Sequence, residues 1–111
     1  MLDSWHFFRS EPDFALLAAI PGEAVFALQL EDAPAAPSAD LAHESLHERL
    51  IPGEGELDLV AFVHTVLTGG TPALIGPEVF SERTSEIPAR WLGRLLGDRT
   101  RELLEAGTGA P

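Results

Sequence analysis

The sequence of 111 residues contains no cysteine, so neither disulfide bonds nor thiolate metal sites can form. It also lacks an apolar run of about 18 residues, which is the length that a membrane-spanning helix needs. The opening segment MLDSWHFFRS lacks the basic and then apolar layout of a secretory signal. These absences predict a soluble, cytoplasmic protein.

Basic side chains are few: 7 Lys and Arg stand against 18 Asp and Glu, which gives a formal net charge of −11. Nucleic-acid binding and binding to anionic membranes both depend on clustered basic side chains. We therefore expect neither nucleic acid nor a membrane as a partner. The hydrophobic share of 45% is ordinary for a globular protein, and the length suits one domain.

Apolar patterning predicts strands that alternate with helices, which is typical of parallel βα units and an α/β fold. The segment 24–30 is apolar on both faces, as in parallel sheets that helices cover. Trp91 and several leucines supply the apolar stripe of the last predicted helix, which Pro88 begins. The predicted strands are 2–8, 24–30 and 73–80, and the predicted helices are 14–20, a short one within 38–50, 57–67 and 88–106.

A long polar connection, residues 31–56, joins the second strand to the next helix. Connections of this length in a compact domain tend to be functional. Ser38 is the predicted cap of the short helix inside it, and Pro52-Gly53-Glu54-Gly55 predicts a turn. Glu31 and Asp32 predict a solvated turn, with substrate contact by Asp32 as the alternative.

One polar side chain interrupts or follows each predicted strand, namely Asp3, Gln29 and Glu78. The carboxyl ends of parallel strands carry the functional groups of α/β barrels and sheets. Three oxygen donors without thiolates suit Mg²⁺ or Mn²⁺. In the alternative interpretation Asp3 serves only as a cap, Gln29 hydrogen-bonds to backbone and Glu78 is a solvated strand end.

Four segments in order, LDSWHFFR, LQLEDAP, ERLIPGEGELDLVAF and IGPEVFSE, resemble the carboxyl-terminal part of the sugar phosphate isomerase/epimerase family. The most specific element is Arg-x-x-Pro-Gly-Glu-Gly, from Arg49 to Gly55. Members of this family have a xylose isomerase-like TIM barrel. The resemblance covers nearly the whole chain and implies that residues 1–111 form the last three βα units, a partial TIM barrel.

The resemblance also implies an activity: metal-dependent isomerisation or epimerisation of a small sugar or hydroxy-carbonyl compound, by proton transfer through an enediolate. By resemblance, Asp3, Gln29 and Glu78 hold the metal, and Glu78 is also the catalytic base. His6 and Arg49 bind the substrate. The implied cofactor is Mn²⁺ or Mg²⁺, with Co²⁺ or Zn²⁺ as alternatives.

The sequence departs from the family in two ways. A whole barrel needs about 200–250 residues, and one family glutamate from an earlier strand has no counterpart here. In addition, Pro77 precedes Glu78, and proline is disfavoured in central strands. An incomplete barrel leaves strand edges unpaired, which predicts self-association or pairing with an amino-terminal barrel half. A non-catalytic fragment or assembly partner is the alternative.

A competing motif lies in the long connection, where His43-Glu44-Ser45-Leu46-His47 spells His-Glu-x-x-His. In zinc hydrolases with this motif the two histidines bind Zn²⁺ and the glutamate activates water. A small zinc hydrolase, with His64 or Glu78 as a third ligand, is therefore a second alternative. Solvated loop residues are the simpler interpretation.

Overall fold

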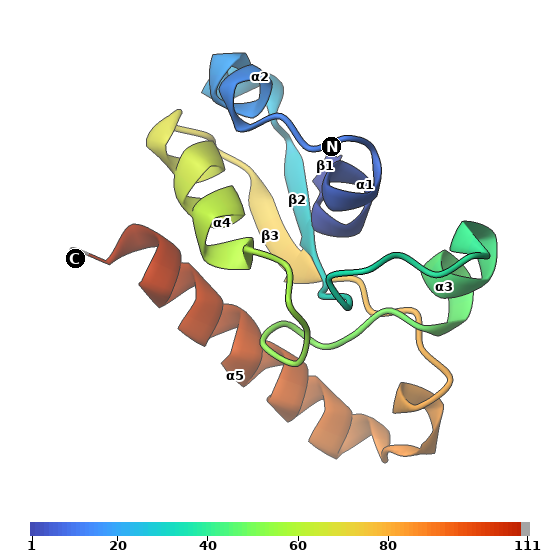
Figure 1. Cartoon of the computed structure of the whole chain (residues 1–111). Coiled ribbons are helices and arrows are strands. Elements are labelled where there is room, and N and C mark those ends of the chain that lie inside the picture. Colours follow the sequence, from blue (N-terminus) through green and yellow to red (C-terminus); the bar gives the residue numbers. More distant parts are fainter. Residues whose placement is uncertain (110–111) are drawn as a thin grey trace.

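Three short parallel strands lie at the centre of the computed structural model, which describes residues 1–109 (Figure 1). Within these residues the sheet has the order β1-β2-β3, and each strand follows its neighbour through a helical connection. This confirms the α/β fold with parallel strands. The elements are β1 Leu2–Asp3, α1 Ser4–Arg9, α2 Phe14–Ala19, β2 Ala27–Leu30, α3 Leu41–His47, α4 Leu59–Thr68, β3 Leu74–Pro77 and α5 Ala89–Thr108, with short 3-10 turns at Gly22–Ala24 and Thr84–Glu86.

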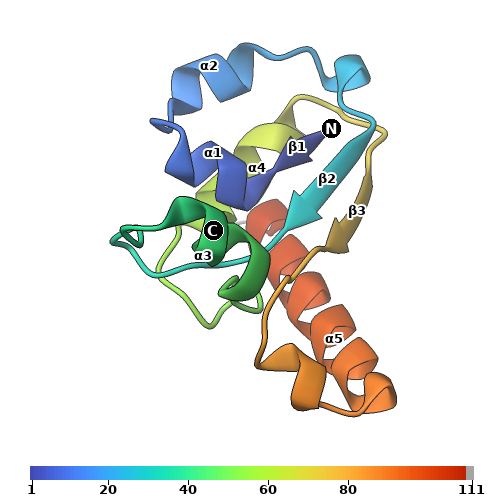
Figure 2. The same cartoon turned by 90° about the vertical axis from the view of Figure 1, so that its right-hand side faces the viewer.

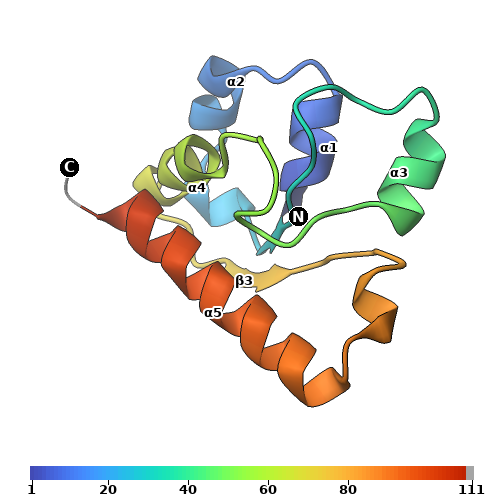
Figure 3. The ribbon, with the colours of Figure 1, turned by 60° about the horizontal axis from the view of Figure 1, so that its bottom comes forward.

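The hydrophobic core lies between the sheet and its helices. Leu28 and Leu30 of β2 are fully buried against Phe62 and Val63 of α4. The helices α4 and α5 run side by side (Figures 1 and 3). Figure 2 shows β2 and β3 pointing the same way, with α5 behind them. Among residues 1–109, no helix is both long and apolar enough to cross a membrane.

The first apolar run is mostly a helix, so the predicted strand 2–8 is wrong. The strand ends at Asp3, whose carboxylate caps α1 by accepting the His6 backbone N–H at 2.9 Å. A side-chain acceptor at this position satisfies a free N–H of the first turn. The centres of the Phe7 and Phe8 rings then lie 5.2 and 6.0 Å from that of Phe62, so these two side chains of the apolar run pack against the core.

Other element boundaries differ in small ways from the sequence prediction. Asp40, not Ser38, caps α3 by accepting the His43 N–H. Trp91 does not join the buried stripe of α5: it is 50% exposed, and the guanidinium groups of Arg90 and Arg94 lie 5.1 and 5.4 Å from its ring centre. The Trp91 ring thus lies at the surface beside two guanidinium groups.

Pro77 is accommodated without disturbing the sheet. Leu74 donates its backbone N–H to Phe26, and Glu78 donates its N–H to Leu30 at 3.2 Å. Because N–H groups along a strand alternate in direction, the nitrogen of Pro77 faces away from β2. The missing donor costs no hydrogen bond to β2, and Glu78 keeps its place in register beside the end of β2.

Candidate metal centre

Strand register places the predicted metal ligands on one face of the sheet. Asp3 of β1 pairs with Gln29 of β2, and Gln29 pairs with Gly76 of β3. Side chains alternate along a strand, so Glu31 and Glu78, each two residues further on, point to the same face. The opposite face carries the buried Leu28 and Leu30 of the core.

Three carboxylates meet at the carboxyl ends of the strands. Asp3, Glu31 and Glu78 each offer an oxygen, and these oxygens all lie within 4.8 Å of one another. Among residues 1–109 this is the only such group of acidic, histidine or cysteine side chains. The structure therefore brings Asp3 and Glu78 together as the sequence predicts. Gln29 lies half-buried one step back on the same face.

Glu31 is the site residue that sequence reasoning missed. It was expected in a solvated turn but is fully buried. Its Oε1 accepts the Trp5 backbone N–H at 2.6 Å and the Ser4 hydroxyl at 3.1 Å. The Ser4 hydroxyl also donates to the Glu31 backbone carbonyl at 2.7 Å and accepts the Glu31 backbone N–H at 3.0 Å. The spacing Gln29-x-Glu31 was the available signal, because it keeps both side chains on one face.

The second oxygen of Glu31 has no hydrogen-bond partner within the described part of the chain. Burial above all, together with the neighbouring Asp3 carboxyl, raises the pKa of Glu31 to about 8. The Trp5 N–H and the charge of Arg49 oppose this rise. Within that part of the chain the second oxygen has only an ion pair with the Arg49 guanidinium at 3.5 Å, so the carboxylates surround a cationic group, and their oxygens are also the ligands that hard divalent cations prefer.

Arg49 reaches into this group from the long connection. Its guanidinium Nη1 lies 3.3 Å from Asp3, 3.5 Å from Glu31 and 3.7 Å from Glu78. The side chain is 4% exposed, and Nε donates to the Ser45 carbonyl at 2.7 Å. One positive charge therefore balances part of the negative charge of the three carboxylates.

Aromatic rings flank the Arg49 guanidinium. The Trp5 ring centre lies 5.3 Å and the Phe80 ring centre 5.1 Å from its central carbon, within cation–π range. His6, the other predicted substrate ligand, packs edge-on against Trp5 at 5.0 Å and is exposed. The structure thus places Arg49 inside the carboxylate group and His6 at the surface, on the other side of the Trp5 ring.

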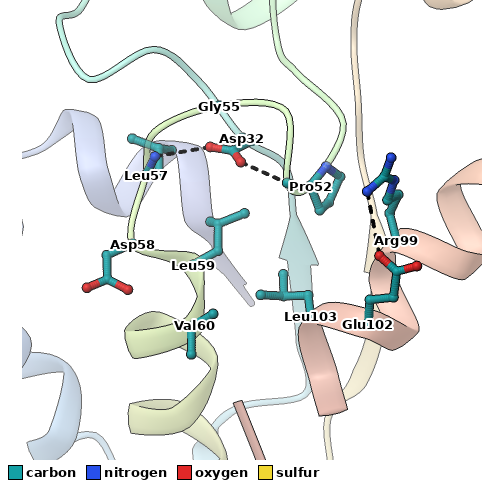
Figure 4. Close-up of a pocket in the computed structure, with 11 residues that line it drawn as sticks. Asp32, Pro52, Gly55, Leu57, Asp58, Leu59, Val60, Arg99, Glu102 and Leu103 are labelled. Carbon is teal, nitrogen blue, oxygen red and sulfur yellow. Dashed lines mark hydrogen bonds and ion pairs between the residues drawn. The ribbon is translucent and has the colours of Figure 1, made fainter. Parts of the chain in front are cut away.

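Asp32 is not part of a solvated turn, because it is only 2% exposed. Its carboxylate accepts the backbone N–H of Gly53 at 3.0 Å and of Leu57 at 3.1 Å (Figure 4). Its backbone forms an antiparallel bridge with Leu50. Asp32 therefore holds the Pro-Gly-Glu-Gly turn, which begins three residues after Arg49 in the chain.

The His-Glu-x-x-His segment does not have the geometry of a hydrolase. Glu44 is 3% exposed and accepts hydrogen bonds from Arg9 Nε and the Trp5 indole, both at 2.8 Å, and from the Ser38 N–H at 3.0 Å. Although burial raises the pKa of Glu44, these donors hold it below its ordinary value. Both carboxylate oxygens are already engaged by these donors, so Glu44 is not free to activate a water and the hydrolase alternative is not supported.

The sequence is similar to part of two curated bacterial enzymes. No protein-family model matches the chain. The chain is 32% identical over 90 residues to the 3-dehydroshikimate dehydratase of Pseudomonas putida and 34% identical to that of Pseudomonas aeruginosa. The match covers 81% of this chain but only 14% of each of these relatives.

Solved structures match almost the whole chain. A xylose isomerase domain protein from Alicyclobacillus acidocaldarius has a TM-score of 0.83 and 26% identity over 98% of this chain and 38% of that protein. The IOLI protein, solved with a bound zinc atom, also has a TM-score of 0.83, at 19% identity and with the same coverage of 98% and 38%. A fusion of a xylose isomerase-like TIM barrel with 4-hydroxyphenylpyruvate dioxygenase has a TM-score of 0.75 and 29% identity, over 96% of this chain and 17% of that one. The chain thus has the fold of a part of a xylose isomerase-like TIM barrel, and it spans only a small part of the curated relatives that it matches.

Proposed function

We propose that the chain contributes the metal-binding and proton-transfer groups of an enzyme that acts on a small sugar or hydroxy-carbonyl compound. In this proposal Asp3, Gln29 and Glu78 hold a divalent cation, with Mn²⁺ or Mg²⁺ favoured by the oxygen donors. The observation that carries it is that carboxylate oxygens of Asp3 and Glu78 lie within 4.8 Å of each other and of Glu31, with Gln29 in register beside Asp3 on the same face. Glu31 adds a fourth oxygen donor beside these ligands.

The chemistry shared by sugar isomerases, epimerases and dehydratases starts with removal of a proton next to a carbonyl group. A bound divalent cation supplies Lewis-acid stabilisation of a carbonyl oxygen and its neighbouring hydroxyl. Glu78 suits the role of base, because its side chain is 32% exposed and so is open to a substrate. Arg49 and His6 orient the substrate, and Trp5 forms a wall between them.

The printed activity of the curated relatives favours dehydration as the reaction class to test first. Both are 3-dehydroshikimate dehydratases, and both share 90 aligned residues with this chain. Loss of water from a hydroxy-carbonyl compound needs the same proton removal that we assign to Glu78. A hydroxy ketone is therefore the substrate class that the proposal names.

Mn²⁺ binding is the direct test of the proposed ligands. The variants Asp3→Asn and Glu78→Gln are expected to weaken Mn²⁺ binding by at least about tenfold, since even an outer partner of a metal ligand contributes that much. Isothermal calorimetry at constant pH measures the loss. Gln29→Ala is expected to act in the same direction.

The matched control is Glu86→Gln, which removes an exposed carboxylate outside the site. Its Mn²⁺ isotherm should overlay that of the wild type. Identical isotherms for Asp3→Asn, Glu78→Gln and the wild type would rule out this site.

We also propose that further strands complete the sheet, either from a second copy of the chain or from an amino-terminal barrel half. Within residues 1–109, β1 and β3 each have one edge without a partner strand. Phe26 and Leu74 are 73% and 82% exposed. The chain spans 38% of the barrel-containing protein from Alicyclobacillus acidocaldarius.

Sizing with light scattering tests this pairing. The chain is expected to elute as a dimer or larger species at micromolar concentration, because unpaired strand edges and exposed apolar side chains favour association. Charged substitutions Phe26→Asp and Leu74→Asp are expected to shift it toward the monomer, while Leu16→Asp on α2 serves as an exposed apolar control. A sharp monomeric peak for the wild type would contradict self-association.

A further inference from the structure

A positive charge of the chain itself lies among the carboxylates of the candidate metal centre. One nitrogen of Arg49, Nη1, lies 3.3 Å from Asp3, 3.5 Å from Glu31 and 3.7 Å from Glu78. The side chains of Asp3, Glu31 and Arg49 are almost fully buried, and solvent ions screen buried charges much less than exposed ones. The guanidinium therefore acts as the counter-charge of the whole carboxylate group.

The rest of the Arg49 side chain is held by groups outside the carboxylates. Its Nε donates to the Ser45 carbonyl at 2.7 Å, and its Nη2 donates to the Ser45 hydroxyl at 2.8 Å. The rings of Trp5 and Phe80 flank its central carbon at 5.3 and 5.1 Å. These contacts do not use Nη1, so the guanidinium keeps its place even when Nη1 loses its acidic partners.

A divalent cation at this site would need the same oxygens that Nη1 contacts. Hard cations bind oxygen ligands at about 2.0–2.6 Å, so a cation that touches one of these carboxylates lies within about 6 Å of Nη1. Two positive charges at that separation repel each other, and they repel more strongly in a buried site than in water. Carboxylate oxygens that bind the cation are in addition no longer free to accept from Nη1. The guanidinium and the cation therefore oppose each other.

From this geometry, and resting on the metal site of the proposed function, we propose that Arg49 is a built-in counter-cation that competes with the divalent cation for Asp3, Glu31 and Glu78. It holds the carboxylates together when no metal is bound, and it lowers the affinity of the site for metal. Metal binding releases Nη1 from the carboxylates, while the Ser45 contacts keep the guanidinium in place. The released N–H is then free to donate to a substrate oxygen, so metal binding precedes substrate binding by Arg49.

Mn²⁺ calorimetry at constant pH tests this competition. Arg49→Gln is expected to tighten Mn²⁺ binding by at least about tenfold, because a neighbouring positive charge is removed from a buried site. Arg49→Lys keeps a positive charge, so its affinity for Mn²⁺ should stay much closer to that of the wild type. The matched control is Arg101→Gln, which removes an exposed guanidinium on α5 and should bind Mn²⁺ like the wild type.

Urea unfolding with and without Mn²⁺ provides the second measurement. Without added metal, Arg49→Gln is expected to be less stable than the wild type, because its buried carboxylates have lost their counter-charge. The same concentration of Mn²⁺ should stabilise Arg49→Gln more than the wild type, since tighter binding to the folded state stabilises it more. If Arg49→Gln is unfolded without metal, Mn²⁺ should refold it. A variant that stays unfolded in saturating Mn²⁺ would show that the cation does not replace the guanidinium, and would overturn the proposal.

Asp3→Asn separates this inference from the proposed function. If Asp3→Asn loses Mn²⁺ binding while Arg49→Gln binds Mn²⁺ no more tightly than the wild type, the competition is overturned and the metal site stands. If Asp3→Asn, Arg49→Gln and the wild type give identical isotherms, the cation binds elsewhere, and the metal site and the competition are both overturned.

Discussion

Replacing Glu44 by alanine is expected to destabilise the fold by about 3–5 kcal/mol, which is the cost of leaving one member of a buried ion pair without its partner. Glu44 and Arg9 are each 4% exposed along their side chains, and Arg9 Nε lies 2.8 Å from the carboxylate. Without that carboxylate, the buried guanidinium loses its counter-charge and keeps only backbone carbonyl acceptors, and the indole N–H of Trp5 loses its acceptor. The loss is measured as the free energy of unfolding in urea at pH 7.

An exposed ion pair on α5 provides the matched control. Arg99 and Glu102 lie 3.6 Å apart with side chains 43% and 66% exposed. Glu102→Ala is expected to cost less than about 1 kcal/mol, because water screens such pairs. If Glu44→Ala and Glu102→Ala lower the free energy of unfolding by similar amounts, the buried ion pair of Arg9 and Glu44 stabilises the fold no more than an exposed pair does.

The Glu44 network also explains how a polar connection is fixed against α1. Arg9 donates to the Pro34 carbonyl at 2.7 Å, and Ser38 donates its N–H to Glu44. The Trp5 indole N–H donates to the same carboxylate, and the Trp5 ring packs against the Arg49 guanidinium. The long connection is therefore tied both to the helix below it and to the site residue that it carries.

The sheet was predictable from the sequence because its signals are local. A segment apolar on both faces indicated a covered parallel strand, and β2 is such a strand. The helix in the first apolar run was not predicted, because Asp3 both ends β1 and caps α1, so the change from strand to helix falls inside one apolar run. Oδ1 of Asp3 caps α1, while its Oδ2 faces Arg49 at 3.3 Å. The capping interpretation and the presence of Asp3 in the carboxylate group are thus both correct.

The carboxylate group was only partly predictable, for a different reason. Asp3 ends β1, and Glu31 and Glu78 each lie one residue beyond a strand. The sequence places Glu78 inside the predicted strand 73–80, but Glu31 follows the predicted strand 24–30, so only Glu31 is left out of the predicted site. The backbone of Glu31 stays in register with the strands through Ser4, so its side chain turns inward. Arg49 lies 46 residues from Asp3 along the chain, and its approach depends on the bridge between Asp32 and Leu50. Local sequence patterns carry no information about such a long-range contact.

Gly55→Ala is expected to destabilise the fold by about 2–4 kcal/mol, because a single methyl group has no room at the Pro-Gly-Glu-Gly turn. A Cβ at Gly55 would lie 2.5 Å from the Ala33 carbonyl oxygen and closer still to Oδ1 of Asp32. To relieve these contacts the turn must move away from Asp32. That movement breaks the hydrogen bonds from Gly53 and Leu57 to the Asp32 carboxylate (Figure 4).

Gly93→Ala is the matched control and has the opposite expected sign. Gly93 lies within α5 with no atom within 4 Å of an added Cβ, so alanine there should stabilise the helix by about 1 kcal/mol. Urea unfolding of both variants, with Asp32→Asn as a third, measures the two effects. Asp32→Asn should destabilise in the same direction as Gly55→Ala, because the amide replaces one acceptor oxygen with a donor that faces a backbone N–H. If Gly55→Ala leaves stability unchanged while Asp32→Asn lowers it, the turn has room to move without losing its carboxylate. The close packing of Gly55 would then not be what holds the segment after Arg49 in place.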